Sequence, residues 1–334
     1  MVSVEHARSA LFGLDPRACV MWLATVDDRP AGCTALYLRD LACNEQETSL
    51  PIGYWAHLFV LPEHRRRMLY PQLVLTMRRA MPELGIEAIL TAMRRPSVTE
   101  AHLKLGFRSV CTWPVRLKPF RPAALVAKHK GLPLLRPLSP LIDGPWSVGL
   151  GMLRPRADDR VQLHEAASLR GNAGFLDEAC DLLASVRGQR CASRWTPERL
   201  ADRLGEGVDG RPYRIACIRQ DGRLDGLAIF RTAVRGNGVR TGVLLELAAR
   251  DDRADLLSPL AVACERELVR QRAEAVLWLD GAGQRHTKLL SALGYRPAPG
   301  ETYRLIALTS KPAKALLPED ALRWRFTFLD HDAF

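Results

Sequence analysis

Two histidines and one glutamate stand where a titrating side chain could transfer protons. His57 lies in an apolar run between Trp55 and Phe59, and His102 lies in a short segment with helical spacing. A histidine changes charge near neutral pH, so each could act as a general acid or base. The alternatives are a structural strand histidine for His57 and an ordinary exposed helix residue for His102. Glu246, in an apolar run of the second half, could be a base or could simply pair with an arginine.

A run of three arginines, Arg65, Arg66 and Arg67, follows Pro62 and could bind an anion. The alternative is a solvated surface run. The net charge of +11 favours an anionic partner such as coenzyme phosphates, an acidic carrier protein, a membrane surface or nucleic acid. The arginines are spread through the chain, and no basic helix has the aromatic spacing of a single-strand binder. We therefore expect no nucleic-acid partner.

Composition excludes several other classes of protein. The eight cysteines form no CxxC pair and no cluster with histidine, so we expect reduced, buried thiols and no metal. The sequence Asp330-His331-Asp332 could ligate a metal, but an edge strand over residues 324–330 is the favoured interpretation. No apolar stretch reaches about 18 residues, and the first twenty residues lack a leader pattern. We expect a cytoplasmic protein without a transmembrane segment.

The elements that position these residues recur in the same order in both halves. The first half predicts three strands at residues 19–25, 32–38 and 54–60. They are followed by a long helix at 69–84, a buried strand at 86–93 and a short helix that ends at Gly106. The second half predicts the same series at 212–218, 226–232, 242–248, 254–272, 275–279 and up to Gly294, preceded by helices at 174–186 and 196–204. Each series is an antiparallel meander that feeds one parallel crossover. The predicted fold class is mixed α/β (α+β), with two lobes that each contain a mostly antiparallel twisted sheet with flanking helices.

One spacing relates the two halves. The pair Gly106-Phe107 matches Gly294-Tyr295 at an offset of 188 residues, and the same offset superimposes Pro71 on Pro259. This indicates an internal duplication. We expect an abbreviated first lobe over 1–118, a proline-rich linker over 119–158, a second lobe over 159–310 and a tail over 311–334. The linker is expected to pack on the lobes, and the alternative is a basic, apolar surface that touches membrane.

The motif Val60-x-Pro62-Glu63-x-Arg65-x-Arg67, followed by a helix and later by Leu105-Gly106-Phe107, resembles the GNAT superfamily of N-acyltransferases in tandem form. The resemblance covers about residues 19–118 and, more loosely, 160–310. It implies that the turn before the long helix binds the pyrophosphate of coenzyme A through backbone N–H groups. The implied donor-binding residues are Phe59, Val60, Arg65, Arg66, Arg67, Met68, Leu69 and Tyr70.

The family signature has glycines at two places where this chain has Met68 and Tyr70. Side chains there hinder the approach of a phosphate to the backbone, whereas the three arginines could supply charge-assisted contacts. The equivalent turn of the second half, residues 249–255, has three aspartates and no glycine. Carboxylates compete with phosphate at a helix N-terminus. We therefore expect the first lobe to bind the donor.

The resemblance also implies the catalytic roles. His57 occupies the place of the family's base, and Glu246 is its equivalent in the second lobe. His102 stands where the family commonly has a tyrosine that acts as the acid. Backbone N–H groups near Phe59 and Val60 would polarise the thioester carbonyl.

The implied activity is transfer of an acyl group from acetyl-CoA or a longer acyl-CoA to an amine. The acceptor would be a biosynthetic small molecule, an amino sugar or a peptide, and an acyl-carrier protein is an alternative donor. A second hypothesis is a catalytically degenerate scaffold that binds a ligand or protein. The missing glycines favour that hypothesis, and the histidines at both catalytic places argue against it.

Overall fold

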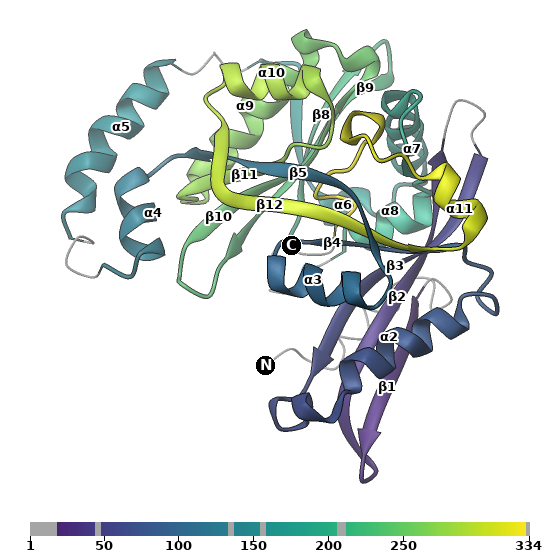
Figure 1. Cartoon of the computed structure of the whole chain (residues 1–334). Coiled ribbons are helices and arrows are strands. Elements are labelled where there is room, and N and C mark those ends of the chain that lie inside the picture. Colours follow the sequence, from purple (N-terminus) through teal and green to yellow (C-terminus); the bar gives the residue numbers. More distant parts are fainter. Residues whose placement is uncertain (1–18, 44–47, 133–136, 154–157, 206–211, 332–334) are drawn as a thin grey trace. The chain divides into compact units, whose positions relative to one another are not determined.

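The computed structural model describes residues 19–43, 48–132, 137–153, 158–205 and 212–331 (Figure 1). The chain forms two compact units, and each unit is assembled from separate stretches of sequence. Unit 1 contains Met1–Trp113, Arg187–Arg194 and Glu301–Arg325, and unit 2 contains Pro114–Val186, Trp195–Gly300 and Phe326–Phe334. Two strands, β5 (Arg108–Pro119) and β12 (Arg296–Thr309), therefore begin in one unit and end in the other.

The sheet of unit 1 has the strand order β1-β2-β3-β4-β12. An antiparallel meander is formed by β1 (Cys19–Val26), β2 (Arg29–Cys43) and β3 (Thr48–Val60). The next strand, β4 (Ala88–Met93), is parallel to β3, whereas β12 is antiparallel to β4. The short strand β7 (Ala192–Ser193) pairs with the end of β2. The helical segments of this unit are η2 (Pro62–Arg67), α2 (Leu69–Ala80), α3 (Pro96–Lys104), α11 (Lys311–Leu316) and η5 (Ala321–Arg323).

Local sequence explains how these elements begin and end. Asp27 and Asp28 form the turn between β1 and β2 with φ values of 51° and 59°, which aspartate tolerates better than most residues and which suits a two-residue hairpin. Gly106 ends α3 with a φ of 95°, a conformation that favours glycine. The buried face of α2 includes Leu73 and Met77, so the helix is held on the sheet by apolar packing rather than by a side-chain cap.

The sheet of unit 2 has the order β5-β11-β10-β9-β8-β6. Its meander is formed by β8 (Arg214–Gln220), β9 (Arg223–Val234) and β10 (Arg240–Ala249). The strand β11 (Ala275–Leu279) is parallel to β10, and β5 and β6 (Val161–Glu165) are antiparallel to their neighbours. The helical segments are α4 (Pro122–His129), α5 (Ser139–Leu153), α6 (Ala166–Leu169), α7 (Ala173–Arg187), α8 (Pro197–Arg203), η4 (Arg250–Asp252), α9 (Ala254–Arg270) and α10 (Gln284–Ala292).

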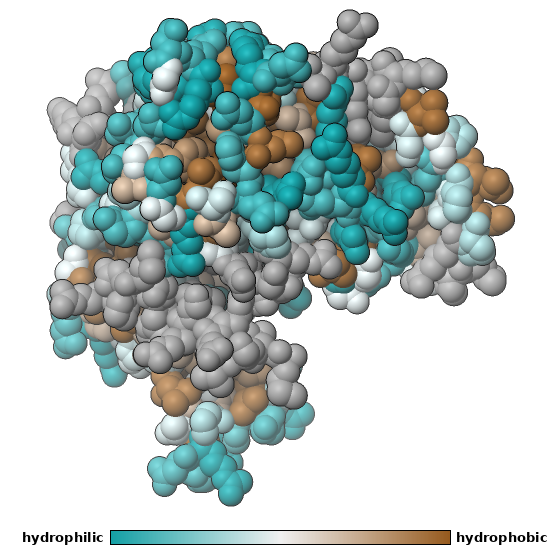
Figure 2. Space-filling view, turned by 180° about the vertical axis from the view of Figure 1, so that it is seen from behind, coloured by the Kyte–Doolittle hydropathy of each residue, from teal (hydrophilic) through white to brown (hydrophobic). Residues whose placement is uncertain are grey.

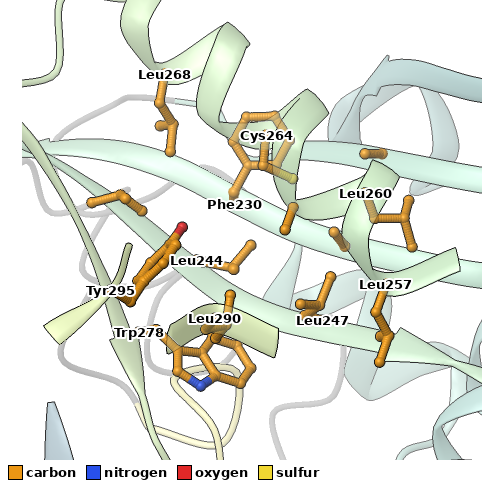
Figure 3. Close-up of a cluster of buried hydrophobic side chains, with 14 of the residues drawn as sticks. Phe230, Leu244, Leu247, Leu257, Leu260, Cys264, Leu268, Trp278, Leu290 and Tyr295 are labelled. Carbon is orange, nitrogen blue, oxygen red and sulfur yellow. The ribbon is translucent and has the colours of Figure 1, made fainter. Parts of the chain in front are cut away.

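The core of unit 2 lies between α9 and the sheet (Figure 3). Leu260 and Leu268 of α9 are fully buried, and each such side chain contributes about 1.5–3 kcal/mol relative to exposure. Gly242 allows the close approach, because a Cβ there would lie 2.7 Å from a methyl carbon of Leu268. The packing of α9 on the sheet therefore requires glycine at position 242.

The mixed α/β fold with mostly antiparallel pairing and flanking helices is confirmed, as are the predicted strands and long helices. The proline-rich stretch expected as a linker contains α4 and α5. The prediction of an edge strand over residues 324–330 is wrong: these residues form no strand beyond one bridge between Trp324 and Cys191, and all seven side chains are buried, which an edge strand with one face in solvent would not allow. Among the described helices, none combines the length and apolar character needed to cross a bilayer.

Candidate active site

A bulge in β3 sets the position of the expected base. The register of β2 and β3 shifts between Cys33 and Ala35, so His57 and Leu58 share one partner position on β2. His57 consequently has a φ of 54°. Histidine within a strand rarely adopts this left-handed conformation. A bulge of this kind changes the direction in which the side chain points.

β3 also diverges from β4 beyond its middle. Their parallel pairing joins residues 52–54 to residues 88–90, whereas β3 continues to Val60. Phe59 and Val60, expected as donor-binding residues, thus lie on the segment of β3 that pairs only with β2 in the described part of the chain. Backbone groups on the side of a diverging strand that faces away from its remaining partner are open to a ligand.

His57 is exposed and is oriented by a second strand. Its Nε2 lies 2.8 Å from the hydroxyl oxygen of Tyr37 on β2, and the two rings meet edge to face. The tyrosine can therefore fix the imidazole while the bulge presents it to solvent. This arrangement suits a base that takes a proton from a dissolved amine.

His102 is fully buried, so the alternative of an ordinary exposed helix residue is wrong. Its Nδ1 lies 2.6 Å from the carbonyl oxygen of Val98 and 2.9 Å from the hydroxyl oxygen of Tyr70. Since a carbonyl only accepts, Nδ1 carries the proton. The ring packs against Trp55 and Phe107, and burial lowers the pKa of His102. The imidazole is therefore held neutral, and its Nε2 has no hydrogen-bond partner among the described residues.

Tyr70 connects this buried histidine with the arginine-rich turn. It is the second residue of α2 and is half-buried, and burial raises its pKa to about 12. Because His102 donates toward the phenol oxygen, the hydroxyl hydrogen of Tyr70 remains available to another acceptor. The sequence singled out Tyr70 as a donor-binding residue and as a side chain in a glycine position, but not as a partner of His102.

The arginine-rich turn is a 3₁₀ segment followed by a left-handed residue. η2 ends at Arg67, and Met68 precedes α2 with φ 57° and ψ 23°. Arg65 donates weakly to the carbonyl oxygen of Val60, at 3.5 Å. Arg66 and Arg67 are exposed and make no ion pair or hydrogen bond within the described residues. Positive charge is thus available at the start of α2, where Leu69 turns into the core.

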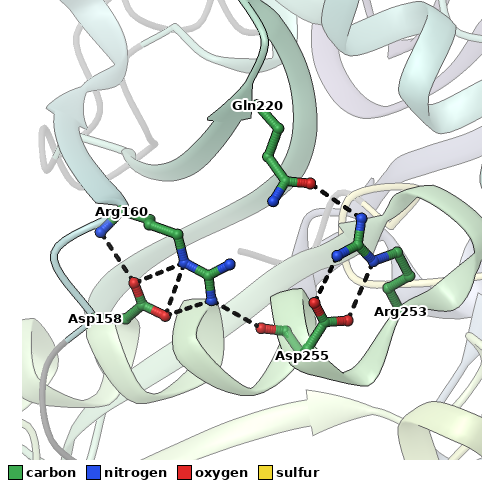
Figure 4. A network of polar contacts seen from close by, with 5 residues as sticks. All are labelled: Asp158, Arg160, Gln220, Arg253 and Asp255. Carbon is green, nitrogen blue, oxygen red and sulfur yellow. Dashed lines mark hydrogen bonds and ion pairs between the residues drawn. The ribbon is translucent and has the colours of Figure 1, made fainter.

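The equivalent turn of unit 2 carries its own counter-ions (Figure 4). Arg253 binds the carboxylate of Asp255 at 2.7 Å, and Arg160 binds that of Asp158 at the same distance. These arginines lower the pKa values of the two aspartates by hydrogen bonding. The carboxylate of Asp255 therefore lies at the start of α9, where it would compete with a bound phosphate.

Glu246 follows the bulge of β10, where Leu245 has no partner on β9, and it is buried. Its carboxylate accepts hydrogen bonds from the backbone N–H of Leu247 at 2.9 Å and from the hydroxyl of Thr327 at 3.0 Å. The same tail segment donates from the N–H of Leu329 to the carbonyl of Leu245 on β10. The tail therefore covers Glu246, a contact between residues 81 positions apart that sequence spacing cannot reveal.

The described residues contain no group of three or more ligating side chains that could hold a metal ion. Asp332 of the Asp-His-Asp sequence lies outside the described residues. Tyr37 and Thr327 are the site residues that sequence reasoning missed. Both act through contacts between segments distant in sequence, for which the sequence has no local signal.

Comparison with known proteins agrees with the geometry of unit 1. Residues 3–107 match the model of the acetyltransferase (GNAT) family. None of the curated proteins compared with the chain matches it.

Solved structures resemble the chain over most of its length at low sequence identity. N-myristoyltransferase from Saccharomyces cerevisiae with bound myristoyl-CoA is 15% identical with a TM-score of 0.60, over 84% of this chain and 67% of that one. A GCN5-related N-acetyltransferase from Anabaena variabilis is 14% identical with a TM-score of 0.56, over 89% of this chain and 64% of that one. A tandem GNAT protein from the clavulanic acid biosynthesis pathway is 11% identical with a TM-score of 0.56, over 87% and 83%. The chain spans about two thirds of the length of the first two relatives.

Proposed function

We propose that the chain is a tandem N-acyltransferase of the GNAT type, whose family model matches residues 3–107, and that unit 1 transfers an acyl group from acyl-CoA to an amine. The acceptor is a small molecule or a peptide, and an acyl-carrier protein is the alternative carrier of the acyl group. Unit 2 has a structural or acceptor-binding role.

The contrast between the two turns carries this assignment. Arg66 and Arg67 have no counter-ion in the described part of the chain, whereas Arg253 and Arg160 are neutralised by aspartates. A coenzyme pyrophosphate needs unpaired positive charge and free N–H groups at a helix N-terminus. Of the two equivalent turns, that of unit 1 offers the arginines without counter-ions among the described residues.

The acid–base groups fit aminolysis of a thioester. His57 takes a proton from the ammonium, and the free amine then attacks the thioester carbonyl and forms a C–N bond as the C–S bond breaks. The second proton of the nitrogen passes to the departing sulfur, so that coenzyme A is released as the thiol. The hydroxyl of Tyr70, held by His102, donates a hydrogen bond to the departing sulfur. A thiol has a pKa near 8.5 and Tyr70 one of about 12, so the thiolate can leave while the phenol keeps its proton. In this proposal His102 is a positioning residue.

The test is a thermal-shift and titration series with coenzyme A, together with release of free thiol from a panel of acyl-CoAs and amines. Reversing both charges, Arg66→Glu with Arg67→Glu, should weaken coenzyme A binding by on the order of tenfold to a hundredfold. Arg253→Glu, in the paired turn of unit 2, is the matched control and should leave binding unchanged.

The outcomes separate the two hypotheses. Coenzyme A binding without thiol release from any acyl-CoA would favour the degenerate scaffold. The side chains of Met68 and Tyr70 in the glycine positions are the observation that supports this alternative. Absence of coenzyme A binding, or its loss in Arg253→Glu alone, would refute the assignment of the donor to unit 1.

A further inference from the structure

A helical hairpin in unit 2 places its only acidic residue inward. Asp143 of α5 is 5% exposed, and its carboxylate accepts from the backbone N–H groups of Ala123 and Ala124 at 2.8 and 3.1 Å. These N–H groups belong to the first turn of α4. Capping by Asp143 therefore holds α4 and α5 together and removes the one negative charge from the outer face of α5.

The outer face of the hairpin is apolar. Leu141, Ile142, Val148 and Trp146 of α5 are 73%, 60%, 58% and 44% exposed. Seven of the fifteen exposed large hydrophobic residues in the described chain fall between residues 126 and 148. In Figure 2 the hairpin lies at the right edge, with brown side chains on its outer side. An apolar concentration of this kind on a single hairpin marks an interaction surface.

The same stretch is strongly cationic. Residues 120–156 contain six lysines and arginines and the single acid Asp143. Arg121 and Lys130 are exposed on α4, whereas Lys128 is engaged by Glu274. Exposed large apolar side chains beside unpaired cations match a surface that offers both hydrocarbon and phosphate.

We propose that the α4–α5 hairpin docks the protein on an anionic lipid bilayer. Leu141, Ile142, Trp146 and Val148 enter the interface, and Arg121 and Lys130 lie at the lipid phosphates. Charge argues against a second copy of this chain as the occupant, because two such faces would bring like charges together. Docking does not depend on the proposed function, since the hairpin shares no residue with the acyl-transfer site.

The test is co-sedimentation of the full chain with vesicles of phosphatidylcholine, with or without phosphatidylglycerol. The wild-type protein should sediment with the anionic vesicles and much less with the neutral ones. Leu141→Ser with Ile142→Ser should lower the partition coefficient by on the order of tenfold or more. Leu322→Ser, an equally exposed leucine of unit 1, is the matched control and should sediment as the wild type does.

A second pair of variants changes charge alone. Arg121→Glu with Lys130→Glu should weaken binding to anionic vesicles more than Arg79→Glu with Lys104→Glu, which changes the net charge equally on unit 1. Three results would overturn the proposal: no sedimentation with either vesicle, sedimentation that is unaffected by the hairpin variants, or an oligomer without lipid that the Leu141 and Ile142 changes dissociate. Thiol release measured in the same samples should be unchanged by the hairpin variants.

Discussion

Met68 and Asp251 share one left-handed backbone conformation, φ 57° and ψ 23°, in the turns that precede α2 and α9. The repeat has therefore kept the shape of this turn without keeping glycine in it. A non-glycine residue in this region costs roughly 1–2 kcal/mol, which indicates that packing of the following helix imposes the turn. In the proposed donor site, the side chain of Met68 would stand where a phosphate approaches the backbone.

The change Met68→Gly should tighten coenzyme A binding. It removes a side chain that is 64% exposed and relieves the strain of the left-handed conformation. Glycine also gives the unfolded chain more conformational freedom, which lowers the free energy of unfolding by about 0.4–1 kcal/mol. We expect the dissociation constant to fall by roughly twofold to tenfold, with little change in the free energy of unfolding. Calorimetric titration measures this, with Asp251→Gly as the control that leaves affinity unaltered. Equal affinity gains in both variants would contradict the prediction.

The pair Tyr70 and His102 should act as one unit. Tyr70→Phe removes the hydrogen-bond donor and should lower kcat by on the order of 10- to 1000-fold. His102→Phe should lower kcat because the phenol loses its orientation, and the double variant should be little worse than Tyr70→Phe. Steady-state kinetics on the four proteins measure the coupling. Independent, multiplicative losses would show that the hydrogen bond has no role in turnover.

His102 should make stability depend on pH. Its folded pKa lies below the ordinary value of 6.5, so the native state favours the neutral ring. The contribution of the neutral ring to the free energy of unfolding is fully present above about pH 6.5 and is lost as the pH falls through the folded pKa. The loss amounts to about 1.4 kcal/mol for each pH unit that separates the folded and unfolded pKa values. Urea denaturation at pH 7.5 and at lower pH should show a smaller decline for His102→Phe than for the wild type. His129→Gln, at an exposed histidine, should decline as the wild type does, and the same decline in all three proteins would contradict the assignment.

Local patterns were sufficient for the strands and helices, but long-range packing decided the site. The turn residues Asp27 and Asp28 and the closing Gly106 adopt positive φ values, and this conformation depends on the residue itself. The burial of His102 depends on Trp55 and on Tyr70, which belong to other elements. Neighbouring residues in the sequence contain no signal for either contact.

The prediction of an edge strand in the tail was wrong. The alternation of aromatic and polar residues after Trp324 predicted a strand with one face in solvent, yet Arg325 and Thr327 are as buried as Phe326. Thr327 has a buried polar partner in Glu246, so its polarity does not mark a solvent-facing position. In the proline-rich stretch, Pro122 lies at the start of α4, where proline is tolerated.

Glu246 should contribute to stability and not to turnover. Its carboxylate is bound by Leu247 and Thr327, so Glu246→Gln should cost about 1–3 kcal/mol of unfolding free energy through weakened hydrogen bonds. Thiol release should stay within about twofold of the wild type, since a lost general base would cost 10²–10⁴-fold. Thr327→Val should have the same pattern. A large loss of turnover in Glu246→Gln at unchanged stability would move the base to unit 2.

His57 should determine the acidic limb of the pH–rate profile. As the base, it must be neutral to accept a proton from the amine, so kcat/KM should fall at acidic pH as His57 is protonated. His57→Ala should lower kcat/KM by 10²- to 10⁴-fold at neutral pH and should move this limb to the pKa of the amine itself, because the remaining reaction depends on free amine alone. Tyr37→Phe loses the contact to Nε2 at 2.8 Å and should keep the limb while lowering the rate by a smaller factor. His64→Ala, at a neighbouring histidine in the arginine-rich turn, is the matched control and should keep both the rate and the limb. An acidic limb that keeps its wild-type position in His57→Ala would refute the assignment of His57 as the base, whatever the size of the rate loss.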